Sequence, residues 1–257
     1  MKKNSFFQIL IALTVLFMVN SCDKKSGTDD PTVFSASSDI QTVIDQFKAE
    51  LGADNGGVPG TQGATGFREV NWDGLTDEEA APNYYPPDLF NSAVAPRARG
   101  LVLSTPGTGL MVSADSNNPT NTLPSFGNIN PNYVSIFPPF SGERLFSPVG
   151  SNIAEVRFYV PGTDTKAVVR GFGAVYVDVD RMENAAFEYF DINDKSLGVY
   201  ATPYLNNGHV FLGVLFPEAI VHRVKVEYGN SPLGPDDSGS IDVSVMDNFI
   251  FGEPQGK

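Results

Sequence analysis

Beyond residue 66, several short segments alternate apolar and polar residues with the period of two expected of a half-buried β-strand. In residues 154–160, for example, Val156, Phe158 and Val160 share one face. Turn signals separate such segments. The segments at 186–190 and 197–200 flank a short polar turn, as in a β-hairpin. The pattern predicts an all-β domain over residues 66–254, built as an antiparallel β-sandwich of jelly-roll type.

One segment ahead of this domain follows the helical period instead. Residues 38–52 place five apolar side chains on one helical face: Ile40, Val43, Ile44, Phe47 and Leu51. The sequence therefore predicts a short amphipathic helix that precedes the sandwich and packs against it. A second exception is the Pro- and Asn-rich stretch 114–148, whose aromatic residues predict that it also packs on the sandwich.

The N-terminus has the three parts of a secretory signal. Lys2 and Lys3 are followed by a mostly apolar run over residues 6–19, which is shorter than a membrane-spanning helix usually is. The sequence Val-Asn-Ser-Cys at 19–22 then resembles the bacterial lipobox, in which the cysteine carries the lipid. This resemblance implies a lipoprotein signal peptide over residues 1–21 and attachment to the membrane through a lipid on Cys22.

Cys22 is the only cysteine in the 257 residues, so no disulfide within the chain is possible. The residues that follow it, 22–37, are mostly polar, and we expect them to form a flexible tether. Asp23 resembles an inner-membrane retention signal in one group of bacteria, whereas charged residues after the cysteine resemble a surface-export signal in another. We expect a cell-envelope location, with the outer membrane or cell surface favoured over the inner membrane.

Charge and motif content narrow the function. With 17 basic and 30 acidic residues, the formal net charge is −13, which disfavours a nucleic-acid partner and favours divalent cations. The sequence contains neither a Gly-x-Ser-x-Gly elbow nor a paired-histidine zinc motif, a phosphate loop or a dinucleotide fingerprint. We therefore expect a protein that is not an enzyme.

The last predicted strand places a carboxylate among apolar residues. Asp247 falls in the same alternation phase as Ile241, Val243, Val245, Phe249 and Phe251. A carboxylate in a core-facing row must be paired, hydrogen-bonded or bound to a metal. Two interpretations stay open for a buried Asp247: it is a calcium ligand, or it is a hydrogen-bonded aspartate. A bulge at the strand end, which Asn248 favours, would instead turn it outward.

Several motifs resemble a family of uncharacterised bacterial exported β-sandwich proteins, some of which carry a C-terminal sorting tail. The motifs are Phe-Arg-Glu-Val-Asn-Trp-Asp-Gly at 67–74 and Val-Met-Asp-Asn-Phe-Ile-Phe-Gly-Glu-Pro at 245–254, with further similarity at 144–152 and 171–180. The resemblance extends over residues 38–254. It implies common ancestry and export, and it implies no particular activity.

A weaker similarity is architectural. Carbohydrate-binding jelly rolls often hold a structural calcium between a Glu of the first strand and an Asp of the last. Glu69 and Asp247 are similar to that pair, with Asp73 as a possible additional ligand, so this resemblance implies a calcium site at the three residues. Asp178 and Asp180 alternate with a row of valines and are predicted to lie on a solvated face.

Aromatic side chains are the remaining candidates for binding. We expect Trp72, the only tryptophan, to lie in the core. Tyr84 and Tyr85 lie in a Pro-rich loop, and they are either a ligand-binding pair or residues packed on prolines.

Three functional hypotheses follow. The first is a lipid-anchored, non-enzymatic envelope protein that binds a glycan or another surface component and contains a structural calcium. The second is a carboxylate-based hydrolase of polysaccharide or ester, with Glu69, Asp73, Asp178 and Glu188 as candidate acids. The third is a structural or adhesive envelope component with a protein partner.

Overall fold

The computed structural model describes residues 30–257, in which β-strands dominate. Two α-helices, α1 (Gln41–Leu51) and α2 (Tyr133–Ile136), and one 3-10 turn, η1 (Asp77–Glu79), accompany them. The strands are β1 (Thr32–Ser37), β2 (Phe67–Val70), β3 (Leu101–Ser104), β4 (Gly109–Val112), β5 (Phe146–Val149), β6 (Ile153–Phe158), β7 (Ala167–Val168), β8 (Gly171–Val179), β9 (Ala186–Phe190), β10 (Ser196–Ala201), β11 (Leu205–Leu215), β12 (Arg223–Glu227), β13 (Val245–Gly252) and β14 (Gln255–Gly256).

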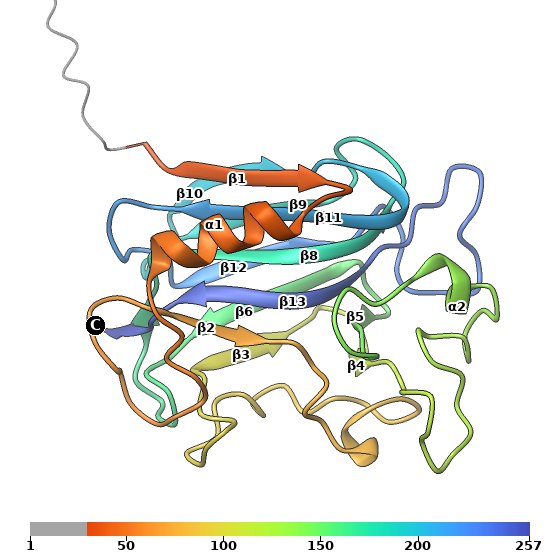
Figure 1. Ribbon diagram of the computed structural model, residues 1–257, viewed down its shortest axis with the longest axis horizontal. Helices are drawn as coiled ribbons and strands as arrows, with labels where there is room; N and C mark the ends of the chain where they lie inside the picture. The colour runs from red at the N-terminus through yellow and green to blue at the C-terminus, as the bar shows by residue number, and fades with distance from the viewer. Residues whose placement is uncertain (1–29) are drawn as a thin grey trace, which may run out of the picture.

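Twelve of the strands form two antiparallel sheets that pack face to face (Figure 1), and β7 pairs with β14 in a separate two-stranded sheet. The larger sheet has the order β1–β11–β8–β13–β5–β4, with β2 also paired to β13, and the smaller has the order β10–β9–β12–β6–β3. Between β5 and β13 the chain passes repeatedly from one sheet to the other, as in jelly rolls. The all-β prediction, an antiparallel jelly-roll sandwich with a short amphipathic helix, is confirmed.

Aromatic and branched residues from both sheets form the core between them. Trp72 lies within it with no exposed surface, which confirms its predicted place in the core. Its ring stacks on Phe146 with the centroids 4.5 Å apart, and its indole Nε1 donates a hydrogen bond to the carbonyl of Asp247 at 2.9 Å. Trp72, which follows β2, therefore links this part of the chain to β13.

Helix α1 lies across the outer face of the larger sheet, in front of β11 and β8 (Figure 1). Its apolar face buries Ile44, Phe47 and Leu51 against Phe211 and Val175. Phe47 meets Phe211 edge to face, with the ring centroids 5.7 Å apart. The amphipathic pattern thus reports packing on the sandwich, as predicted.

The long segment between β4 and β5 covers another part of the same outer face. Phe126, Tyr133 and Phe137 pack there against Val177 of β8 and Val245 of β13. This confirms the predicted packing of the 114–148 stretch. As a result, every residue of β8 and of β13 is buried, including those that point away from the sandwich core.

The smaller sheet keeps its outer face open. Along β6, β9 and β12 buried and half-buried residues alternate strictly, as expected when one face meets the core and the other meets water. Glu155, Arg157, Arg223 and Lys225 lie on this open face.

Part of the predicted tether has a regular structure. Residues 32–37 form β1, which pairs antiparallel with β11 from Thr32 opposite Leu215 to Ser37 opposite Val210. The prediction of a tether over 22–37 is therefore wrong for these residues, because backbone pairing on a sheet edge needs little apolar surface. The signal peptide, Cys22 and the tether up to residue 29 lie outside the described residues.

Within residues 30–257, neither helix has the length and apolar character needed to span a bilayer.

Candidate functional site

The sandwich has a seam where the edge strands of the two sheets meet. β4 ends the larger sheet, β3 ends the smaller one, and the turn 105–108 connects them. The segment 84–87 runs along this seam. The amide of Tyr85 donates to the carbonyl of Leu110 at 2.7 Å, and the amide of Leu103 donates to the carbonyl of Pro87 at 2.8 Å. The two tyrosines thus lie beside the connection between the sheets.

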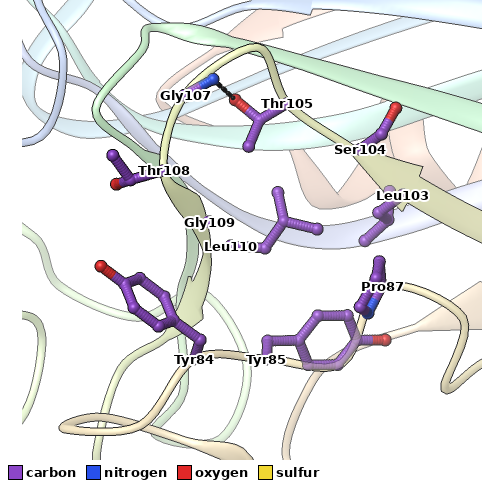
Figure 2. Close-up of a pocket in the computed structure, with 10 residues that line it drawn as sticks. All are labelled: Tyr84, Tyr85, Pro87, Leu103, Ser104, Thr105, Gly107, Thr108, Gly109 and Leu110. Carbon is purple, nitrogen blue, oxygen red and sulfur yellow. Dashed lines mark hydrogen bonds between the residues drawn. The ribbon is translucent and has the colours of Figure 1, made fainter.

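A hollow of about 390 Å³ opens at this seam. It is called the tyrosine hollow here, and it is lined by Tyr84, Tyr85, Pro87, Leu103, Ser104, Thr105, Gly107, Thr108, Gly109 and Leu110. Figure 2 shows the two tyrosines on one side and the turn with Thr105 and Thr108 on the other. The lining therefore combines aromatic and aliphatic surface with hydroxyl groups, and it contains no charged side chain.

Tyr84 is the exposed aromatic residue of the hollow, with 54% of its surface accessible. Its ring lies over Gly109, where a Cβ atom would come within 2.6 Å of the ring. A glycine is therefore required at position 109 for Tyr84 to keep this position. The sequence left Tyr84 open between ligand binding and packing on prolines, and the structure places it at the rim of a hollow.

Tyr85 forms the buried part of the lining. Its ring meets Trp72 edge to face at 5.8 Å, so the core holds it in place. Burial raises the pKa of its hydroxyl well above the ordinary value. Among residues 30–257 this hydroxyl has no hydrogen-bond partner, an arrangement that is uncommon for a buried polar group.

The sequence did not identify the hydroxyl side of this hollow. Ser104, Thr105 and Thr108 are about twenty residues away from the tyrosines along the chain, and only the pairing of 84–87 with both edge strands brings them together. No periodicity or motif in the sequence signals that pairing.

The predicted calcium ligand Asp247 is held by protein donors instead. Its Oδ2 accepts hydrogen bonds from the backbone amides of Phe140 and Ser141, at 2.7 and 3.0 Å. The register of β13 shifts between Met246 and Phe249, so a bulge turns Asp247 towards the covering loop. Of the two interpretations that the sequence left open, this geometry is that of the hydrogen-bonded aspartate. Burial raises the pKa of Asp247 to about 7.

The other two predicted ligands also have protein partners. Asp73 accepts hydrogen bonds from the amides of Glu143 and Arg144, and Glu69 forms an ion pair with Lys48 at 2.7 Å. Among the described residues, Glu69, Asp73 and Asp247 do not form a group of carboxylates close enough to share a cation. The structure therefore does not assemble the calcium site that was predicted at these three residues.

A different group of carboxylates does come together. Single oxygens of Asp178, Asp180 and Asp237 lie within 4.8 Å of one another, and this set is called the acidic cluster here. Asp178 has only 1% of its surface exposed, so its predicted place on a solvated face is wrong. The reason is that the segment between β4 and β5 covers the outer face of β8, which the alternation pattern could not reveal.

Local hydrogen bonds hold the acidic cluster. The backbone amide of Asn207 donates to Asp178 at 2.5 Å, the Asn206 side chain donates to Asp180 at 2.5 Å, and the amide of Val243 donates to Asp237 at 3.1 Å. Burial is the largest cause that raises the pKa of Asp178, to about 8, and it also raises that of Asp237.

Repulsion between neighbouring carboxylates adds to these pKa shifts, so protons or a bound cation must offset the charge. The acidic cluster can hold a metal ion. The sequence did not identify Asp237, because it lies in a Gly- and Pro-rich loop far from Asp178 along the chain.

The four acids proposed for hydrolysis are distributed over different elements. Glu69 lies on β2 and Asp73 follows that strand, whereas Asp178 belongs to the acidic cluster. Glu188 lies on β9 of the smaller sheet, where the Ser196 hydroxyl donates to it at 3.0 Å.

Comparisons with known proteins do not assign the chain to a family. Neither protein-family models nor curated proteins give a match to the chain. Among solved structures, the enzymatically active domain of tailspike protein 4 from bacteriophage CBA120 aligns with a TM-score of 0.31 and 12% identity, over 75% of this chain and 23% of that one. A likeness at this level supports no argument about function.

Proposed function

We propose that this protein is a lipid-anchored, non-enzymatic component of the bacterial cell envelope that binds a neutral glycan in the tyrosine hollow. The observation that supports the proposal is the exposed ring of Tyr84 beside a hollow lined by hydroxyl groups and free of charged side chains. A pyranose ring has one apolar face and a periphery of hydroxyl groups, and this lining is complementary to both.

Tyr84 and Tyr85 would contribute different contacts to a bound sugar. The exposed ring of Tyr84 offers a flat apolar surface on which a sugar ring can stack. Tyr85 is buried, with 3% of its surface exposed, and contributes an apolar wall beside that ring. Because the core fixes Tyr85, little conformational entropy is lost on binding.

Calcium is the second part of the proposal, and we place it at the acidic cluster. Three carboxylate oxygens form the hard, anionic ligand set that calcium prefers. The cluster lies where β8 meets the irregular start of β11, which contains Asn207, and the loop that contains Asp237. A cation there would hold these segments together, which is a structural role and not a catalytic one.

The anchor is the third part, and it rests on the N-terminal sequence. Metabolic labelling with an alkyne fatty acid should label the protein, and Cys22→Ala should abolish the label. Protease treatment of intact cells should then separate display on the cell surface from an inward-facing location. Absence of the label from the wild-type protein would contradict lipid anchoring.

Binding is tested with a glycan array followed by calorimetry on the purified protein. Tyr84→Ala should lower the affinity for the best neutral glycan by about tenfold or more. Tyr204→Ala is the matched control, because Tyr204 is equally exposed, at 52%, and does not line the tyrosine hollow. If no neutral glycan binds, or if both substitutions have the same effect, the tyrosine hollow is not a glycan site.

A further inference from the structure

A second hollow lies directly beside the tyrosine hollow. It has a volume of about 290 Å³ and is lined by Ser104, Thr105, Pro106, Ile153 and Glu155. It is called the Glu155 hollow here. Ser104 and Thr105 line both hollows, so the end of β3 forms a common wall between them. A ligand larger than one hollow can therefore contact both across this wall.

The common wall is rigid. The Thr105 hydroxyl donates to the carbonyl of Ile153 at 2.7 Å and accepts from the amide of Gly107 at 3.0 Å. Ser104 accepts a hydrogen bond from Nη1 of Arg157 at 2.7 Å. Its own hydroxyl hydrogen has no acceptor within residues 30–257 and remains available to a ligand. Preorganised polar groups of this kind bind at low entropic cost.

Beyond the wall, polar groups continue onto the open face of the smaller sheet. Glu155 is adjacent on β6 to the buried Ala154 and Val156, so its side chain points to solvent. It forms ion pairs with Arg157 and with Arg223. These contacts fix a carboxylate and two guanidinium groups side by side, and adjacent acceptors and donors suit the neighbouring hydroxyls of a sugar.

The charges around the two hollows also indicate which kind of glycan chain fits. The tyrosine hollow has no charged lining residue, and Glu155 in the second hollow is compensated by the two arginines. The whole protein has a formal net charge of −13. A polyanionic glycan would meet this net repulsion, whereas an uncharged chain would not.

We propose that the two hollows are adjacent subsites for successive units of one uncharged oligosaccharide chain, which crosses the end of β3 at Ser104 and Thr105. This inference rests on the proposed glycan binding and specifies its ligand: a linear neutral chain of at least two units. The unit over Tyr84 stacks, and the next unit hydrogen-bonds to Glu155.

Calorimetry with sugars of increasing length tests the proposal. The probes are glucose, galactose, mannose and N-acetylglucosamine, each with its own β-1,4-linked di- and trisaccharide. For the sugar that binds, the disaccharide should bind about tenfold more tightly than the monosaccharide, because the second unit adds hydrogen bonds to charged groups. This comparison uses only the wild-type protein, so it does not depend on whether a variant folds.

Variants then locate the second unit. Glu155→Gln should remove most of the advantage of the disaccharide and leave the affinity for the monosaccharide unchanged. Glu218→Gln is the control, because Glu218 is exposed and lines neither hollow. Thermal melting of both variants checks that they are folded.

The outcomes separate the two proposals. A disaccharide that binds no more tightly than a monosaccharide, in a protein whose monosaccharide binding needs Tyr84, overturns the second subsite alone. Equal loss of mono- and disaccharide binding in Glu155→Gln also overturns it. A wild-type protein that binds none of the sugars overturns the glycan proposal itself, and the subsite with it.

Discussion

Arg68 and Glu253 form a bidentate ion pair in which neither side chain is exposed. Nε and Nη2 of Arg68 donate to the two carboxylate oxygens of Glu253, each at 2.8 Å. The guanidinium also donates to the carbonyls of Val58 and Ala98, at 2.8 and 2.6 Å. One buried side chain thus connects β2 with the end of β13 and with the segments between β2 and β3 and between α1 and β2.

Removal of one partner of this pair should be strongly destabilising. Arg68→Met leaves the Glu253 carboxylate buried without its cation, and we expect a loss of about 3–5 kcal/mol in the free energy of unfolding. Urea denaturation followed by the fluorescence of Trp72, the only tryptophan and fully buried, measures the loss.

The matched comparison is Lys48→Met, which breaks the partly exposed pair with Glu69. For this variant we expect a loss of about 1 kcal/mol or less, because solvent screens the pair. Similar losses in the two variants would show that burial does not set the strength of these ion pairs.

The acidic cluster predicts that stability falls as the pH rises, unless calcium is present. The pKa of Asp178 is raised from 3.8 to about 8, so between these values the folded state binds a proton that the unfolded state lacks. Stability must therefore decrease through that pH range in EDTA, and the raised pKa of Asp237 acts in the same direction. Bound calcium would replace the protons and restore stability, most of all at high pH.

Melting curves at about pH 5 and about pH 9, with calcium or EDTA, measure this effect. Asp178→Asn should raise the melting temperature at the higher pH in EDTA by about 4–8 °C, which corresponds to about 2 kcal/mol. Asp237→Asn should abolish the response to calcium, whereas Asp236→Asn, at the exposed neighbouring position, should not. If the melting temperature of the wild-type protein depends on neither pH nor calcium, the proposed calcium site is wrong.

Asp247 should behave as a hydrogen-bond acceptor and not as a metal ligand. Asp247→Ala leaves the amides of Phe140 and Ser141 without their acceptor, and we expect a loss of about 1–3 kcal/mol. Hydrogen exchange at these two amides should become faster, and the stabilisation by calcium should stay as in the wild type. The control is Asp39→Ala, at an exposed position. Loss of the calcium response in Asp247→Ala would restore the ligand assignment made from the sequence.

The sequence predicted best those strands that have one face in water. In β6, β9 and β12 the alternation of residue types matches the alternation of burial, so the pattern located both the strands and their orientation. The hairpin of β9 and β10 was located in the same way, and Tyr200 lies opposite Phe187.

The pattern failed where a third layer covers the sheet. β8 and β13 are buried on both faces, so an aspartate that points away from the core is still buried. Bulges then shifted the phase: Asp178 has a φ angle of 63°, and the register slips beyond Met246. Asp178 was misassigned for this reason. The edge strand β1 was not predicted, because its contribution to the fold is mainly backbone pairing with β11.

The close approach of Gly109 to Tyr84 gives a test of the glycan site in which neither tyrosine is replaced. In Gly109→Ala the new methyl group would lie within 2.6 Å of the Tyr84 ring, so this exposed ring must move away. We expect the affinity for the neutral glycan to fall by about tenfold, while the free energy of unfolding changes by about 1 kcal/mol or less. Gly74→Ala is the matched control, because a Cβ atom at Gly74 has no neighbour within 4 Å. Unchanged glycan affinity in Gly109→Ala would mean that the position of the Tyr84 ring does not matter for binding, and stacking on this tyrosine would have to be abandoned.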